Sequence, residues 1–109
     1  MPSPHQLAII LRFREDKAEE FERLFEEKVL PMLREFKADR KFASAVLSRI
    51  VDDHVPKGIR AYLLELEVLK AEAHDEFDSS KPFLAFLGKA REWQPIEPDV
   101  WIGDPLFRI

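Results

Sequence analysis

Hydrophobic residues alternate with other residues in several segments of the chain. This period of two is typical of β-strands. It predicts strands over residues 6–14, 42–51, 59–69 and 100–102. The polar segment 52–58 separates the second strand from the third, so we expect these two to pair as an antiparallel hairpin. By the same alternation, Phe42 is predicted to share a face with Val46 and Ile50.

A first amphipathic helix is predicted from Asp16 to about Lys37, because its hydrophobic residues recur every three or four positions. Asp16 and Glu19 have the spacing of a capping box, which would begin the helix. Pro31 lies inside the segment and removes one backbone hydrogen bond. A bend or break is therefore predicted near residues 27–31.

A second helical segment is predicted over residues 71–93, where apolar residues again recur at helical spacing. The segment is interrupted near its middle, since Pro82 suits the first turn of a new helix. Either Ser79 or Ser80 is predicted to cap this restart.

The predicted order of elements is β-α-β-β-α-β. This order is typical of a ferredoxin-like α+β fold, a four-stranded antiparallel sheet with both helices on one face. We expect a single domain over residues 1–109, with residues 1–5 as a flexible tail. The second face of the sheet would be bare and rich in aliphatic side chains. Because large exposed apolar patches are unusual in monomers, two sheets are expected to pack as a homodimer that forms a barrel.

Composition narrows the possible partners and chemistry. The chain has 17 basic and 21 acidic residues in short mixed runs, which argues against nucleic acid or a membrane as a partner. It has no cysteine, so disulfides, thiolate chemistry and Cys-based metal sites are excluded. No apolar run approaches the ~20 residues of a membrane span, and the first residues do not resemble a signal peptide. A cytoplasmic location is expected.

Three segments carry a family resemblance. The first is the helical run Val29–Leu33 with its internal proline, and the second is the strand over residues 62–69 that leads directly into a helix. The third is a pattern in that helix, formed by His74, Ser79-Ser80-Lys81-Pro82-Phe83 and Phe86-Leu87. Over roughly residues 6–102 the chain resembles the dimeric α+β barrel superfamily, specifically its antibiotic-biosynthesis-monooxygenase-like group.

The resemblance implies a homodimer with a cleft between helices and sheet in each subunit. It also implies oxygenation of a small aromatic substrate without metal or flavin. This chain departs from the group, since it has no Asn near the pocket and carries Val68 and Leu69 where relatives have a Trp. Residues 88–91 lack the axial His of a related haem-degrading branch, so haem degradation is not expected. Residues 36–41 lack the Gly that often precedes the second strand in relatives.

His74 is the candidate catalytic residue. An imidazole can act as a general base near neutral pH, and Asp78, one helical turn further on, would orient it. Alternatively, His74 only opens its helix and makes local hydrogen bonds. The pair also has metal-ligand spacing, but no third ligand is evident, so neither a metal nor another cofactor is expected.

Three aromatic residues are candidates for substrate binding. Trp93 and Trp101 flank a loop punctuated by prolines, where large rings could line a cleft or close its mouth, and Tyr62 could donate a hydrogen bond. The alternative is that the tryptophans pack in the core or the dimer interface and that the Tyr62 hydroxyl is structural.

The resemblance implies a cofactor-independent, monooxygenase-like enzyme, and the candidate residues suit one that acts on a small, largely apolar organic molecule. The alternative is a homodimer without enzymatic activity that binds a small ligand or has a structural or regulatory role. An open pocket of several hundred Å³ containing His74 would favour the enzyme, and a closed, dry core would favour the alternative.

Overall fold

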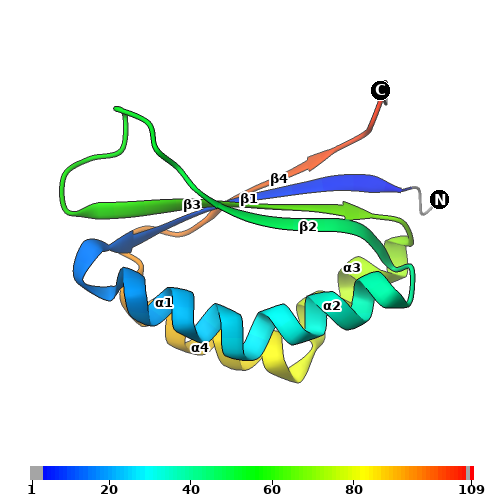
Figure 1. Ribbon diagram of the computed structural model, residues 1–109, viewed down its shortest axis with the longest axis horizontal. Helices are drawn as coiled ribbons and strands as arrows, with labels where there is room; N and C mark the ends of the chain where they lie inside the picture. Colours follow the sequence, from blue (N-terminus) through cyan, green and yellow to red (C-terminus); the bar gives the residue numbers. More distant parts are fainter. Residues whose placement is uncertain (1–3, 108) are drawn as a thin grey trace.

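One four-stranded antiparallel sheet forms one layer of the molecule, and the helices cover a single face of it (Figure 1). The computed structural model describes residues 4–107 and 109. Its elements are β1 (His5–Arg14), the 3-10 turn η1 (Glu15–Lys17), α1 (Ala18–Leu24), the π-helical turn η2 (Phe25–Val29), α2 (Leu30–Ala38), β2 (Phe42–Arg49), β3 (Ile59–Val68), α3 (Ala71–Ser79), α4 (Lys81–Trp93) and β4 (Asp99–Gly103). The strands lie in the order β2-β3-β1-β4. The predicted ferredoxin-like α+β fold is confirmed.

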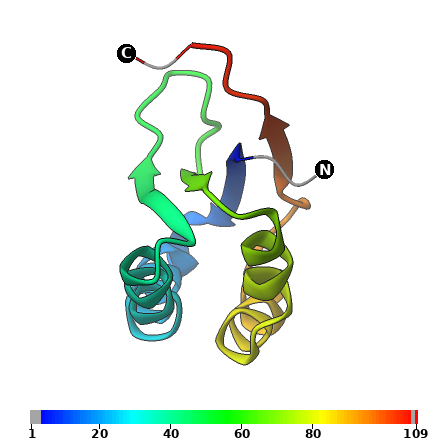
Figure 2. The same cartoon turned by 90° about the vertical axis from the view of Figure 1, so that its right-hand side faces the viewer.

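The helices form two columns under the sheet (Figure 2). One column contains α1 and α2 and lies beneath the β2 side, and the other contains α3 and α4 and lies beneath the β4 side. Among the described residues, none of the helices is both long enough and apolar enough to cross a membrane. Within residues 4–107 and 109, no helix covers the opposite face of the sheet, as expected for this fold.

Phenylalanine is the most frequent residue in the layer between sheet and helices. Four phenylalanines are almost completely buried, namely Phe13, Phe21, Phe42 and Phe77. The rings of Phe13 on β1 and Phe21 on α1 stack with their centroids 4.1 Å apart. Such aromatic contacts join strand to helix and bury much apolar area for each residue.

The irregularity predicted in the first helix is a π-helical turn. The Leu30 N–H donates to the carbonyl of Phe25, five residues back, instead of four. Pro31 follows in the first turn of α2, has no N–H of its own, and its ring would crowd the carbonyl of residue 27 in a regular helix. A wider turn immediately before Pro31 relieves this conflict.

The predicted capping box at Asp16 is wrong. Asp16 lies inside η1, and no side-chain cap bond forms at the described starts of η1 or α1. The chain leaves β1 through a tight 3-10 turn, whose Glu15 N–H donates to the carbonyl of Gly58 at 2.8 Å. This backbone bond ties the beginning of the first helix to the loop before β3.

Helix α2 ends in a Schellman motif that has an unusual residue at its key position. The Lys41 N–H donates to the carbonyl of Phe36 at 2.9 Å, and the Arg40 N–H donates to the carbonyl of Lys37 at 3.0 Å. Arg40 has a φ of 59°, in the left-handed region where glycine is favoured. This is the segment, residues 36–41, in which the family resemblance led us to expect a glycine.

A β-bulge reverses the predicted facing of Phe42. Phe42 pairs with Val68, but the next paired residue is Ser44, so one extra residue interrupts the register. Phe42 therefore points into the core and is 1% exposed, whereas Val46 lies on the open face. The predicted shared face of Phe42 and Val46 is wrong, because strict alternation does not allow for an inserted residue.

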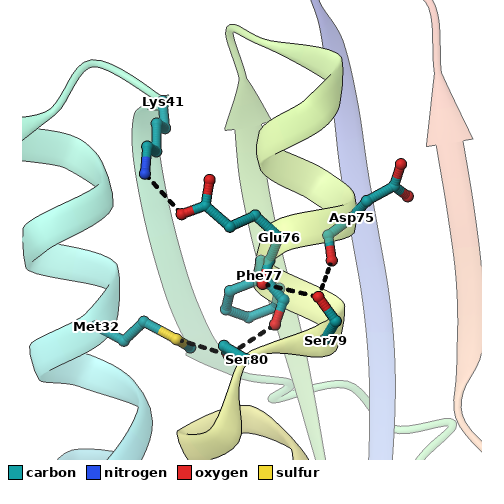
Figure 3. Close-up of polar contacts among 7 residues, drawn as sticks. All are labelled: Met32, Lys41, Asp75, Glu76, Phe77, Ser79 and Ser80. Carbon is teal, nitrogen blue, oxygen red and sulfur yellow. Dashed lines mark hydrogen bonds and ion pairs between the residues drawn. The ribbon is translucent and has the colours of Figure 1, made fainter.

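The second helical segment restarts where Ser80 was expected to cap it, but not by the expected bond. Ser80 occupies the N-cap position of α4 with extended φ and ψ angles. Its hydroxyl donates back to the Phe77 carbonyl at 2.8 Å and lies 2.9 Å from the sulfur of Met32 (Figure 3). The hydroxyl thus closes α3 and contacts α2 without capping α4, whose Leu84 N–H donates instead to the backbone carbonyl of Ser80 at 2.9 Å.

The first residue of β1 is His5, although the sequence analysis predicted that His5 belongs to a flexible tail. His5 pairs with Val68 of β3. Residues 1–3 of that expected tail lie outside the described residues. The tail therefore does not include His5, which is held where it can reach the helices.

Candidate functional site

A cavity of about 870 Å³ lies between the α3–α4 column and the sheet. Its apolar walls come from the core-facing side of the sheet and from α4, through Leu7, Ile9, Leu11, Leu64, Phe83, Phe86, Leu87 and Val100. The proline-rich loop over residues 95–98 completes its rim. This volume is within the range of small-molecule sites, and its walls are mostly apolar as such sites usually are.

His74 and Asp78, both on α3, supply polar groups to this cavity. His74 Nε2 lies 3.2 Å from a carboxylate oxygen of Asp78, at the i, i+4 spacing expected on one helix face. The other ring nitrogen, Nδ1, lies 3.0 Å from Nε2 of His5. The structure therefore joins three titratable groups into one chain from β1 to α3.

The directions of these two bonds limit what His74 can do. In a neutral ring, Nε2–H donates to the Asp78 carboxylate and Nδ1 accepts from His5. Both ring nitrogens then have protein partners. His74 can therefore take a proton from a ligand only if it breaks one of these two hydrogen bonds. The sequence predicted the bond to Asp78 but not the one to His5.

The surroundings of Asp78 change the acidity of its carboxyl. Partial burial raises the pKa of its carboxyl, Asp75 raises it further, and the attraction of His74 opposes both without cancelling them. A carboxyl with a raised pKa on a cavity wall is suited to exchange protons with a ligand.

Gln94 adds a polar group that sequence reasoning missed. It is the C-cap residue of α4, directly before Pro95, and it lines the cavity. Its Oε1 is buried and has no hydrogen-bond partner among the described residues. The loop was visible in the sequence through its prolines, but the expected binding groups were the aromatic residues on either side of it.

Tyr62 is not one of the described residues that line this cavity. It borders a smaller hollow of about 390 Å³ on the other side of the core, beneath β2. Its hydroxyl donates to a carboxylate oxygen of Glu22 on α1, which also lies 3.5 Å from Arg49. Burial and the Glu22 carboxylate raise the pKa of Tyr62 well above that of a free tyrosine.

The two tryptophans are also absent from the described cavity wall. Trp93, the last residue of α4, is half-buried and packs against the core. Trp101 pairs with Ala8 on the open face of the sheet and is 66% exposed. Of the four residues predicted for the site, only His74 lies on the cavity, and the substrate-binding roles of the other three remain predictions.

In the part of the chain that the structure describes, no three His, Cys, Asp or Glu side chains are grouped so that they could hold a metal ion. His74 directs its two nitrogens to different partners, which does not suit a shared metal.

Solved structures with the same architecture cover nearly the whole chain. A candidate antibiotic biosynthesis monooxygenase from Nitrosomonas europaea is 11% identical with a TM-score of 0.76, over 94% of this chain and 99% of its own. A dimeric ferredoxin-like protein from an uncultured marine organism is 13% identical with a TM-score of 0.76, over 98% and 91%. A third, from Caulobacter crescentus and also a candidate antibiotic biosynthesis monooxygenase, is 17% identical with a TM-score of 0.69, over 97% and 92%.

These structures confirm the predicted resemblance at the level of the fold. Neither the comparison with protein-family models nor the comparison with curated proteins found a match. At such low identity the shared architecture does not transfer an activity, because one fold carries many functions.

Proposed function

We propose that this protein is a monooxygenase-like enzyme that acts on a small, largely apolar organic molecule without a metal or organic cofactor. The observation that carries the proposal is the apolar cavity of about 870 Å³ with His74 and Asp78 on its wall. This is the open pocket that distinguishes the enzyme from the closed core of a purely structural dimer. The names of the structural neighbours point to the same class of reaction.

The His74–Asp78 pair is the proposed acid/base group. The apolar wall excludes water and orients the ligand, and Asp78 accepts a proton from it. His74 holds the carboxylate through Nε2 and is itself held by His5, so it acts through Asp78.

The oxidant is molecular oxygen and the reductant is the substrate itself. A phenol gives its hydroxyl proton to Asp78, O2 adds at a ring carbon, and loss of water leaves a quinone, so that phenol + O2 gives quinone + H2O. The proton held by Asp78 leaves with that water, and no external reductant is needed.

The functional unit is proposed to be a homodimer formed through the open face of the sheet. Val46 and Trp101, which are 50% and 66% exposed, flank the partly buried Ala8, Ile10 and Leu63 on this face. Pairing two such faces would remove apolar area from water, and one structural neighbour is described as dimeric.

Oxygen uptake with a panel of phenols tests the proposed activity. Removing the acid/base group in Asp78→Asn, or its positioning residue in His74→Ala, is expected to lower turnover about 100-fold or more. The matched controls are Asp52→Asn and His54→Ala, because these two residues form a similar His–Asp pair in an exposed turn. If the cavity variants retain full turnover while binding of the substrate is unchanged, the pair has no catalytic role.

A second function is favoured by one observation. Both ring nitrogens of His74 already have protein partners, as in a structural histidine. A homodimer that binds its ligand without converting it would have this arrangement. In that case the phenols would bind the cavity, and no oxygen would be consumed with any of them.

A further inference from the structure

One side of α4 borders the cavity and changes character from one end of the helix to the other. Phe83, Leu87 and Arg91 follow one another at intervals of four residues, and all three line the cavity wall. Residues at this spacing lie on the same side of a helix, one above the other. The side of α4 that faces the cavity is therefore apolar along most of its length and cationic in its last turn.

This cationic end lies away from the His74–Asp78 pair. His74 and Asp78 belong to α3, which precedes α4 in the same column, so Phe83 is the nearest of the three α4 residues to them along the column (Figure 1). Arg91 lies about 12 Å beyond Phe83 along the helix axis, at a rise of roughly 1.5 Å for each residue. The cavity wall thus carries polar groups toward both ends and an apolar stretch between them.

Arg91 is accessible to a ligand and is not used by the fold. It is an exposed residue that also borders the cavity. The ion pairs among the described arginines are formed by Arg12, Arg49 and Arg60, and Arg91 takes part in none of them. A guanidinium presents a planar fork of N–H donors that matches a carboxylate, and it stays charged at any physiological pH. The end of α4 is therefore suited to bind a carboxylate group.

Glu97 also borders the cavity and would favour a ligand of the opposite charge. It lies in the loop after α4, outside every helix and strand. Arg91 is the better binding group, because it lies on a helix and is aligned with the apolar residues that would contact the body of the ligand. Its two parallel N–H bonds to a carboxylate would also be stronger and more specific than a single contact between Glu97 and an ammonium group.

We propose that Arg91 is a ligand-binding residue, whose guanidinium pairs with the carboxylate of an elongated aromatic acid in the cavity. This inference rests on the proposed function, because it assumes that the cavity takes a phenol with its hydroxyl at Asp78. It adds a second functional group to the substrate, a carboxylate at the other end of the molecule from the hydroxyl. The substrate class is then that of the hydroxyphenyl-alkanoic acids.

Calorimetric titration at neutral pH with three matched phenols tests the inference. The first, 3-(4-hydroxyphenyl)propanoate, carries the carboxylate, and 3-(4-hydroxyphenyl)propanamide is its neutral counterpart of nearly the same shape. The third, tyramine, carries an amine instead. The wild-type protein is expected to bind the acid about fivefold more tightly than the amide, the effect of one ion pair at an accessible position. Arg91→Gln is expected to lose this preference while binding the amide as before, which also shows that the variant is folded.

A matched control variant makes the test decisive. Arg23 is also an exposed arginine in the last turn of its helix, α1, but it is not among the described residues of the cavity wall, so Arg23→Gln is expected to keep the preference. Equal binding of the acid and the amide by the wild type, or a preference that survives in Arg91→Gln, overturns the inference alone. Tighter binding of tyramine than of the amide also overturns it, because Glu97 would then select the ligand. Failure of all three phenols to bind overturns the proposed cavity function as well.

Discussion

The hydroxyl of Tyr62 shows how a side chain can be well placed for structure rather than for a ligand. Its ring is 2% exposed and contacts Phe13 and Phe21, while its hydroxyl reaches Glu22. From the sequence, a binding role and a structural role for this hydroxyl were equally consistent. The alternation of apolar and polar residues predicted the face of β3 on which Tyr62 lies. Its hydrogen-bond partner, Glu22 on α1, depends on packing between distant segments and did not follow from the sequence.

Because Tyr62 is the only tyrosine of the chain, its ionisation can be followed by absorbance. Its pKa in the folded protein is raised above the ordinary value of 10.0, so the folded state keeps a proton that the unfolded chain releases. Stability from this group is present below pH 10 and decreases as the pH rises further. We expect tyrosinate absorbance to appear only together with unfolding, as monitored by circular dichroism.

The variant Tyr62→Phe separates the two roles. It is expected to lower the free energy of unfolding by about 1–2 kcal/mol, because a hydrogen bond to a carboxylate is lost. Ligand affinity should be unchanged, since Tyr62 lies outside the cavity wall. Weaker binding of a phenol at full stability would instead support the substrate-binding role predicted from the sequence.

At the scale of elements, the end of α2 carries a conformational cost. Arg40 adopts a left-handed φ of 59° that its Cβ disfavours, within a motif that usually has glycine at this position. Arg40→Gly is therefore expected to stabilise the protein by up to about 1 kcal/mol, the gain being reduced by the greater freedom of glycine in the unfolded chain. Arg40→Ala keeps the Cβ and is the control. Equal unfolding midpoints in urea for the two variants would show that the backbone there is not strained.

The helices also show which parts of an element can be predicted from sequence. The disturbance at Pro31 followed from the missing N–H, and the restart near Ser80 followed from Pro82. The form of the disturbance, a π-helical turn, did not follow, because it depends on how Phe25 and Val29 pack against the core. The bulge after Phe42 was missed for the same reason, since burial of the Phe42 ring outweighs strict alternation.

At the scale of the whole molecule, the bare face of the sheet is the proposed dimer interface. Trp101→Lys replaces an apolar ring of that interface by a charge, and because Trp101 is 66% exposed within one subunit, the folded monomer should tolerate the change. Light scattering at micromolar concentration is expected to show a dimer for the wild type and a monomer for this variant. Val51→Lys, at an 89% exposed position outside the strands, should remain dimeric. A monomeric wild type would contradict the proposed assembly.

The fold followed from the sequence far more completely than the site did. The order of elements and the single helical layer follow from periodicity, which most core residues reinforce, Phe42 being an exception. The candidate site depends instead on a few residues, such as His5 beside His74 and Gln94 on the cavity wall, that are distant from His74 in the sequence and lack a pattern of their own. Local spacing could relate His74 to Asp78, but only the register of β1 against β3 brings His5 to the same place.

The cavity wall is divided between two kinds of residue, and this division bears on how the protein could change over generations. Its floor consists of residues such as Leu7 and Leu64, which are 1% and 2% exposed and also hold the core together. Its rim over residues 95–98 lies outside every helix and strand. Substitutions in the floor would endanger folding, whereas substitutions in the rim would not. Selection for new ligands is therefore free to act on the rim, and descendants of this chain can diverge in specificity while keeping the same architecture.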